Sequence, residues 1–198
     1  NKVFCMKECG DNALEVLYVL EACVDSVESA IAAQQGGAKR VELCGNLIIG
    51  GTSPGKALFQ AVRKYTDLEI RVLLRPRFGD FCYDEYEFEI MKEDVQMYRE
   101  LGADGIVTGI LLPDGRLDSV RMGELIREAG NADVALHRAF DVCSDPYETL
   151  EGAVDLGIRT ILTSGQKNSA WEGRELLREL VRRSDGRIEI LVGAGVSP

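Results

Sequence analysis

Two segments of the sequence share a Glu-x-Cys pattern that could bind a soft metal ion. "LEACVDS" (20–26) carries Glu21 and Cys23, and "VELCGN" (41–46) carries Glu42 and Cys44. Both resemble strand ends, where residues two apart point to the same face. If the strands are neighbours and both pairs face inward, two thiols and two carboxylates meet at one corner. Two thiolates suit Cu(I), which tolerates few ligands; the alternative for each cysteine is a small apolar filler.

Further groups with possible chemistry follow other apolar runs. "LLRPRFGDF" (73–81) and "LHRAFD" (136–141) supply three arginines, a histidine and a carboxylate: Arg75, Arg77, His137, Arg138 and Asp141. Together with the glutamates they could provide a general acid and base with an anion clamp. We also expect Arg75 to lower a thiol pKa or to pair with a carboxylate. The alternative for His137 is a hydrogen-bonded structural histidine, and Cys82 and Cys143 are expected to be fillers.

The chain must place these residues on repeated strand and helix units. Runs rich in Val, Ile and Leu alternate with amphipathic stretches, and glycine often stands between a helix and the next strand, as in "ELGADGIVTG". Ser26 or Asp25, Pro54 and Pro146 suit helix starts. The pattern predicts strands near 16–24, 39–44, 69–75, 104–109, 132–138, 159–163 and 187–193. It predicts helices near 26–36, 54–66, 84–101, 118–129, 146–157 and 171–184.

Strict alternation predicts an α/β fold with parallel strands. A doubly wound nucleotide-binding sheet usually has a glycine-rich turn after its first strand, and "LEACVDSVES" has no glycine. We therefore predict a (β/α)8 TIM-type barrel whose site lies at the carboxyl ends of the strands. We expect a single domain over 1–198, with an N-terminal extension (1–18) and with the eighth strand and last helices absent. Such a barrel leaves two unpaired edges unless something else closes the gap.

Composition limits the class of partner. The chain has 198 residues and a net charge of -10, which disfavours nucleic acid and anionic membrane surfaces. Its apolar runs fall short of the roughly 20 residues of a membrane span. Six scattered cysteines without a secretion signal indicate reduced thiols and a cytoplasmic protein. Cys5 and Cys9 are expected to be ordinary thiols in the N-terminal segment.

Eight motifs, in order, resemble those of the CutC family, often called copper homeostasis proteins. They are "EACVDSVESA", "GGAKRVELC", "GGTSPG", "RPRFGDFCY", "GADGIVTGIL", "LHRAFD", "ILTSG" and "VGAGV". The resemblance runs from about residue 19 to the last residue. The sequence departs from the family pattern at "CGNLIIGG", and the family continues past "GAGV" with a further helix, strand and helix.

The resemblance implies an eight-fold βα barrel and a cytoplasmic, homo-oligomeric protein of copper homeostasis. It implies Cu(I) bound at Cys23 and Cys44, with the remaining pocket formed by Glu21, Glu42, Arg75, Arg77, His137, Arg138 and Asp141. A second hypothesis stays open: a barrel enzyme that acts on a small anionic or phosphorylated metabolite. The glycine-rich "LVGAGVS" (191–197) could hold a phosphate on backbone amides.

Overall fold

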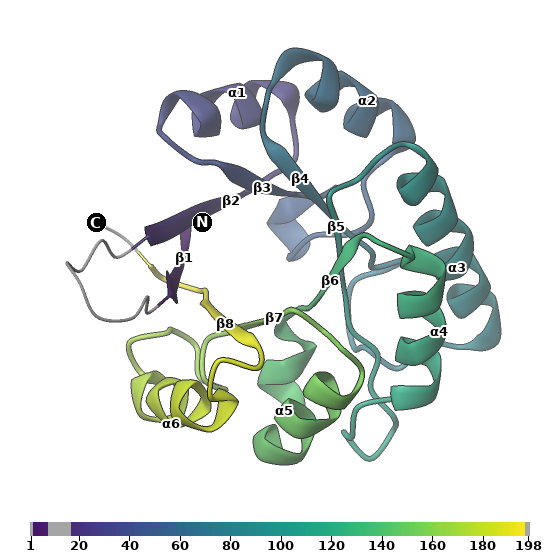
Figure 1. The fold of residues 1–198 in the computed structure, drawn as a ribbon. Helices are drawn as coiled ribbons and strands as arrows, with labels where there is room; N and C mark the ends of the chain where they lie inside the picture. Colours follow the sequence, from purple (N-terminus) through teal and green to yellow (C-terminus); the bar gives the residue numbers. More distant parts are fainter. Residues whose placement is uncertain (1, 8–16, 197–198) are drawn as a thin grey trace.

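Strands and helices alternate as the sequence predicts. The computed structural model describes residues 2–7 and 17–196, and its helices surround a central sheet (Figure 1). The parallel strands are β2 (Leu17–Val24), β3 (Arg40–Leu43), β4 (Glu69–Leu73), β5 (Gly105–Thr108), β6 (Asp133–Leu136), β7 (Thr160–Thr163) and β8 (Glu189–Val192). The helices are α1 (Val27–Gln35), α2 (Lys56–Tyr65), α3 (Glu85–Glu100), α4 (Ser119–Ala129), α5 (Pro146–Asp155) and α6 (Arg174–Ser184). The seven predicted strands, the six predicted helices and the α/β barrel class are confirmed.

Local chemistry explains several helix boundaries. The Ser26 hydroxyl accepts from the backbone N–H of Ser29 at 3.1 Å and so caps α1. Asp145 caps α5, and Pro146 occupies its first position. The prediction for Pro54 is wrong, because α2 begins at Lys56, after the N-cap Gly55. Gly102 follows α3 with φ +77°, a conformation that costs glycine little.

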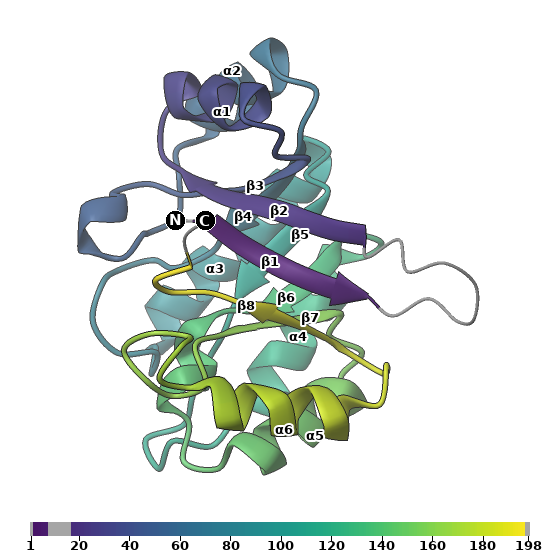
Figure 2. The same ribbon diagram turned by 90° about the vertical axis from the view of Figure 1, so that its left-hand side faces the viewer.

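A short strand from the N-terminal extension closes the sheet. Strand β1 (Lys2–Lys7) lies between β2 and β8 (Figure 2). It pairs antiparallel with β2 over six residues, from Lys2 opposite Ala22 to Lys7 opposite Leu17. Its pairing with β8 is limited to Phe4 opposite Val192. The two edges that we expected to be unpaired therefore face β1, and Cys5 lies on this strand, whereas Cys9 falls outside the described residues.

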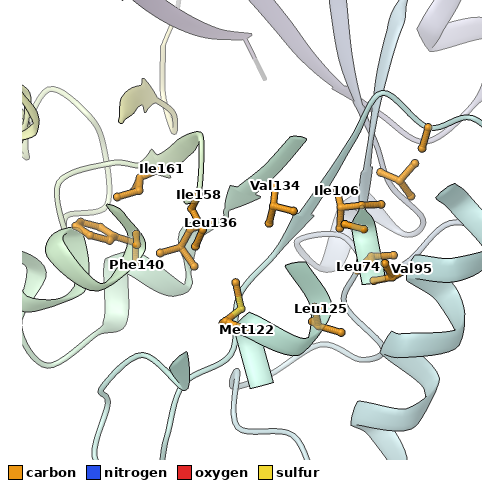
Figure 3. Packing of buried hydrophobic residues seen from close by; sticks show 14 of the residues in the cluster. Leu74, Val95, Ile106, Met122, Leu125, Val134, Leu136, Phe140, Ile158 and Ile161 are labelled. Atoms are coloured by element: carbon orange, nitrogen blue, oxygen red, sulfur yellow. The ribbon is translucent and has the colours of Figure 1, made fainter. Parts of the chain in front are cut away.

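The main apolar core lies between the strands and the helices. Alternate strand residues such as Ile106, Val134 and Leu136 point outward and pack against Met122 and Leu125 of α4 (Figure 3). Because side chains alternate along a strand, the residues between them point into the barrel. None of the described helices is long and apolar enough to cross a membrane. The core thus fixes which residues line the barrel interior.

Two short 3-10 helices shape loops at the carboxyl ends of the strands. Helix η1 (Leu47–Ile49) follows β3, and η2 (Arg138–Val142) follows β6. These loops, with those after β4 and β7, form the mouth of the barrel.

Candidate functional site

One buried carboxylate at the mouth contacts both cysteines of the Glu-x-Cys pairs. Cys23 lies directly opposite Glu42 in the pairing of β2 with β3, and Cys44 follows two residues later on the same face. The Cys23 thiol donates to Glu42 Oε2 at 3.6 Å, and the Cys44 thiol lies 3.7 Å from Oε1. Glu42 and Cys44 are almost fully buried, whereas Cys23 is half-buried. The structure therefore brings Cys23, Glu42 and Cys44 together.

Burial favours the neutral, protonated form of all three side chains. It raises the pKa of both thiols well above the usual value, and the nearby Glu42 charge raises them further. Burial and the charge of Glu21 raise the pKa of Glu42 from 4.5 to about 7. The expectation that Arg75 lowers a thiol pKa is wrong. Both thiols are protonated at neutral pH, so a metal ion must displace their protons.

The loop after β3 covers Cys44. Gly51 has φ +88°, and a Cβ there would lie 2.8 Å from Leu73 Cδ2 and 3.6 Å from Cys44 Sγ. The loop is held at its other end because the backbone N–H of Leu47 donates to Asp25 Oδ2 at 3.3 Å. Glycine suits this position because of its positive φ and the nearby Leu73 methyl group, whereas the thiol itself lies at an ordinary contact distance.

Glu21 lies deeper in the barrel than expected. It forms a buried ion pair with Arg40, the first residue of β3, instead of facing the mouth. Arg40 and Arg71 both lie near Glu69 Oε1, at 3.8 and 3.7 Å, and Arg71 donates to Thr160 Oγ1 at 3.2 Å. A charged layer thus fills the barrel below the cysteines. Sequence reasoning missed Arg40 and Arg71. Arg40 stands two residues before Glu42 and Arg71 two residues before Leu73, so the alternation of side chains along a strand could have placed both arginines in the barrel interior.

His137 lies at the mouth as a neutral side chain. Its Nδ1 accepts from the backbone N–H of Ala139 at 3.1 Å, which leaves the proton on Nε2. Burial and the positive charge of Arg75 lower its pKa from 6.5 to about 3. Gly109 makes room for the ring, because a Cβ there would lie 2.8 Å from Cε1 and Nδ1.

The histidine environment can be measured directly, because His137 is the only histidine in the sequence. We expect its imidazole NMR signals to stay constant from pH 8 down to about pH 4. In Gly109→Ala, the displaced ring should regain solvent and titrate nearer 6.5. Wild-type titration near pH 6.5 would contradict the buried placement.

Arg75 holds two loops of the mouth together. Its Nη1 donates to the carbonyl oxygens of Gly50 and Gly51, at 3.3 and 3.2 Å, and its Nη2 donates to that of Gly79 at 2.8 Å. The expectation that Arg75 pairs with a carboxylate is wrong for the described residues, since its contacts are backbone carbonyls. Arg75 therefore links the loop over Cys44 to the loop after β4.

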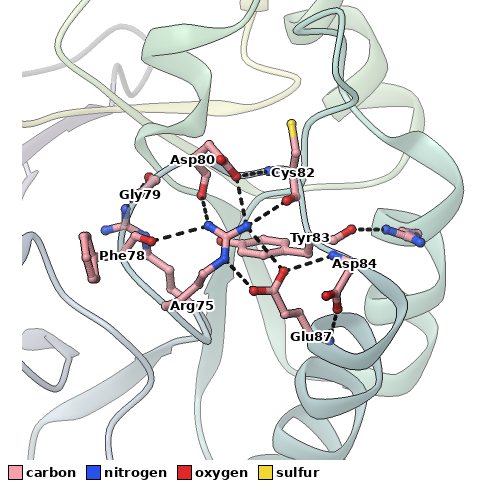
Figure 4. A network of polar contacts seen from close by, with 10 residues as sticks. Arg75, Phe78, Gly79, Asp80, Cys82, Tyr83, Asp84 and Glu87 are labelled. Atoms are coloured by element: carbon pink, nitrogen blue, oxygen red, sulfur yellow. Dashed lines mark hydrogen bonds and ion pairs between the residues drawn. The ribbon is translucent and has the colours of Figure 1, made fainter.

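Arg77 turns away from the barrel interior and fastens the same loop to α3. It pairs with Glu87 and Asp80, at 2.5 and 3.0 Å, and donates to the carbonyl oxygen of Cys82 at 2.9 Å. Figure 4 shows this network, with Asp80, Cys82 and Glu87 around one guanidinium. Arg77 is thus occupied by the protein itself.

Arg138 and Asp141 are also satisfied within the protein. Arg138 Nε pairs with Asp141 Oδ2 at 2.7 Å, and the same carboxylate accepts from the backbone N–H groups of Ser164 and Gln166. Asp141 thereby ties η2 to the loop after β7. Because Arg77, Arg138 and Asp141 already have partners, the arrangement does not favour the multi-arginine anion clamp of the enzyme hypothesis.

Cys82 and Cys143 pack together with apolar residues near η2. Cys143 is buried beside Leu111 and Ala139, and Cys82 packs at the edge of that cluster. Gln166 Nε2 lies 3.4 Å from Cys143 Sγ. Among the side chains that the structure describes, no group of three or more His, Cys, Asp or Glu is arranged to hold a metal ion.

Comparisons with known proteins place the chain in a family. The model of the CutC family matches residues 18–198. The chain belongs to the CutC family. A CutC family protein of Xanthomonas campestris pv. campestris is 49% identical over 178 residues, which cover 90% of this chain and 74% of that protein. The mouse copper homeostasis protein cutC homolog is 42% identical over 91% of this chain and 66% of its own length.

A solved CutC structure has the same architecture. The crystal structure of a CutC protein from Streptococcus agalactiae superposes with a TM-score of 0.85 at 33% identity, covering 89% of this chain and 88% of that chain. This CutC chain therefore shares both the fold and the sequence pattern of the family, and the Glu-x-Cys pairs lie inside the matched region.

Proposed function

We propose that this chain is a copper homeostasis protein that binds one Cu(I) ion between Cys23 and Cys44. The observation that carries the proposal is the contact of both thiols with the two oxygens of Glu42. This contact places the sulfur atoms of Cys23 and Cys44, two soft ligands, on either side of the Glu42 side chain. The names of the mouse and streptococcal relatives support the copper assignment.

The chemistry of the three residues favours a soft, weakly solvated ion. Thiolates select Cu(I) over hard cations such as Mg²⁺. Because burial holds both thiols protonated, an ion must form strong bonds to sulfur to displace the two protons. Before binding, the Cys23 thiol donates to the Glu42 carboxylate, and the Cys44 thiol lies within reach of both the carboxylate and the backbone carbonyl of Glu42. The free thiols of Cys23, Cys44, Cys82 and Cys143 also fit a reducing compartment, and we propose a cytoplasmic location.

A competition titration against a Cu(I) chelator tests this function. We expect wild type to bind about one Cu(I) per chain under anaerobic conditions, and Cys23→Ser/Cys44→Ser to lose this binding, because serine oxygen is a poor ligand for Cu(I). The matched control is Cys82→Ser/Cys143→Ser, which removes two thiols from the same mouth and should leave the stoichiometry unchanged. Unchanged binding in the first variant, with loss in the control, would reverse the assignment.

A further inference from the structure

Arg75 differs from the other buried arginines in lacking a charged partner. Three arginines are nearly buried in the described residues, and Arg40 and Arg71 both lie within 4 Å of carboxylates. Arg75 is only 8% exposed, and its side chain donates to three backbone carbonyls. Its Nε is buried without an acceptor. A buried guanidinium is strongly destabilised unless a negative charge compensates it.

Two further buried donors without acceptors belong to residues at the same place. His137 Nε2 carries the imidazole proton and has no partner, and the Tyr83 hydroxyl is also unpartnered. His137 is 5% exposed and Tyr83 is 5% exposed. Buried donors in native proteins almost always have an acceptor. Three such donors, two from the loop after β4 and one from the end of β6, indicate a missing group that is rich in acceptor oxygens.

Arg75 and His137 both contact the ring of Phe81. The Arg75 guanidinium carbon lies 4.9 Å from the centre of the Phe81 ring, and the His137 ring lies 4.8 Å from it, centre to centre. The charge of Arg75 contributes to the lowered pKa of His137. Burial raises the pKa of Tyr83, and the charges of Arg75 and Arg77, with a close side-chain approach of Arg75 to the Tyr83 hydroxyl, oppose that rise. Tyr83 and Arg75 lie on the same loop (Figure 4).

We propose that Arg75, Tyr83 and His137 form a site for the carboxylate of a small organic acid. One uncompensated cation matches one negative charge, and the two neutral donors match the remaining lone pairs of a carboxylate. A dianion would leave an unmatched charge in a buried place. Phe81 lies against Arg75 and His137 and is half-buried on the loop after β4, so binding requires this ring to move aside.

The site adjoins the proposed copper ligands through one residue. The Gly51 carbonyl oxygen accepts from Arg75 Nη1, and the Gly51 backbone packs beside Cys44. A carboxylate bound at Arg75 would therefore be separated from Cys44 by the backbone of Gly51. The proposal does not depend on copper binding.

Thermal unfolding with added carboxylate tests the site. Formate and acetate are titrated at pH 7 against chloride of equal ionic strength, with inorganic phosphate as a separate arm. We expect the Tm of wild type to rise and saturate with formate or acetate, because a ligand that binds only the native state stabilises it. Tyr83→Phe and His137→Phe should each weaken the response at least tenfold. Tyr65→Phe, at an exposed tyrosine, is the matched control and should respond like wild type.

The variants separate this site from the others. Arg75→Leu should abolish the response, but it also removes three loop contacts, so Tyr83→Phe and His137→Phe carry the decision. Cys23→Ser/Cys44→Ser should retain the full response. A response that persists unchanged in both Tyr83→Phe and His137→Phe, or the lack of any saturating rise, would overturn the site. A phosphate response that these variants abolish would overturn the assignment to a carboxylate.

Discussion

Replacing Arg40 by methionine is expected to lower the free energy of unfolding by about 3–5 kcal/mol. The change leaves Glu21, which is 1% exposed, as a buried carboxylate without its arginine. Removing one partner of a buried ion pair has this magnitude because the remaining charge stays desolvated. Urea unfolding at pH 7 measures the effect.

A double variant shows whether the loss comes from the unpaired charge. Arg40→Met/Glu21→Leu replaces the pair by apolar side chains, so it should recover most of the stability. The matched control is Arg187→Met, which breaks an exposed pair with Glu151 and should change the stability little. The account is wrong if Arg40→Met is no less stable than this control, or if the double variant is as unstable as the single one.

Glu42→Gln is expected to remove a pH dependence of stability that wild type shows between pH 4.5 and 7. The folded pKa of Glu42, about 7, lies above its unfolded value of 4.5, so the folded state holds this proton more tightly. The stabilisation is therefore complete below pH 4.5 and is lost as pH rises through 7. A shift of this size corresponds to about 3 kcal/mol.

The relevant quantity is the difference in unfolding free energy between Glu42→Gln and wild type. From pH 4.5 to pH 8, the unfolding free energy of wild type should fall by about 3 kcal/mol relative to that of Glu42→Gln. His137 acts in the opposite sense, since its lowered pKa destabilises the folded state as pH falls below 6.5, but it is common to both proteins and cancels. A difference that does not change with pH would contradict the burial of an ionisable carboxylate between the two thiols.

Much of the fold follows from the sequence because each unit repeats the same signals. Apolar runs, helix caps such as Ser26 and glycines such as Gly102 act locally, and they predict the order of strands and helices. The meeting of Cys23 with Cys44 was also predictable, because side-chain alternation and neighbouring parallel strands bring matched positions together. Homo-oligomerisation stays a prediction.

The parts that the sequence did not predict depend on contacts over long distances. Strand β1 has no repeat signal, and its place between β2 and β8 arises from tertiary pairing. The stagger of β2 against β3 sets Glu21 opposite Arg40, below the mouth, and periodicity does not reveal stagger. Likewise, only the folded loops determine that Arg77 is occupied by Glu87 while Arg75 lacks a carboxylate.

X-ray absorption at the copper edge tests the central claim most directly. The protein is loaded anaerobically with one Cu(I) per chain, and the extended fine structure gives the identity and number of the ligand atoms. We expect two sulfur ligands in wild type and in Cys82→Ser/Cys143→Ser, and none in Cys23→Ser/Cys44→Ser. Copper bound through nitrogen or oxygen in wild type, or sulfur ligation that survives the loss of Cys23 and Cys44, would contradict this claim.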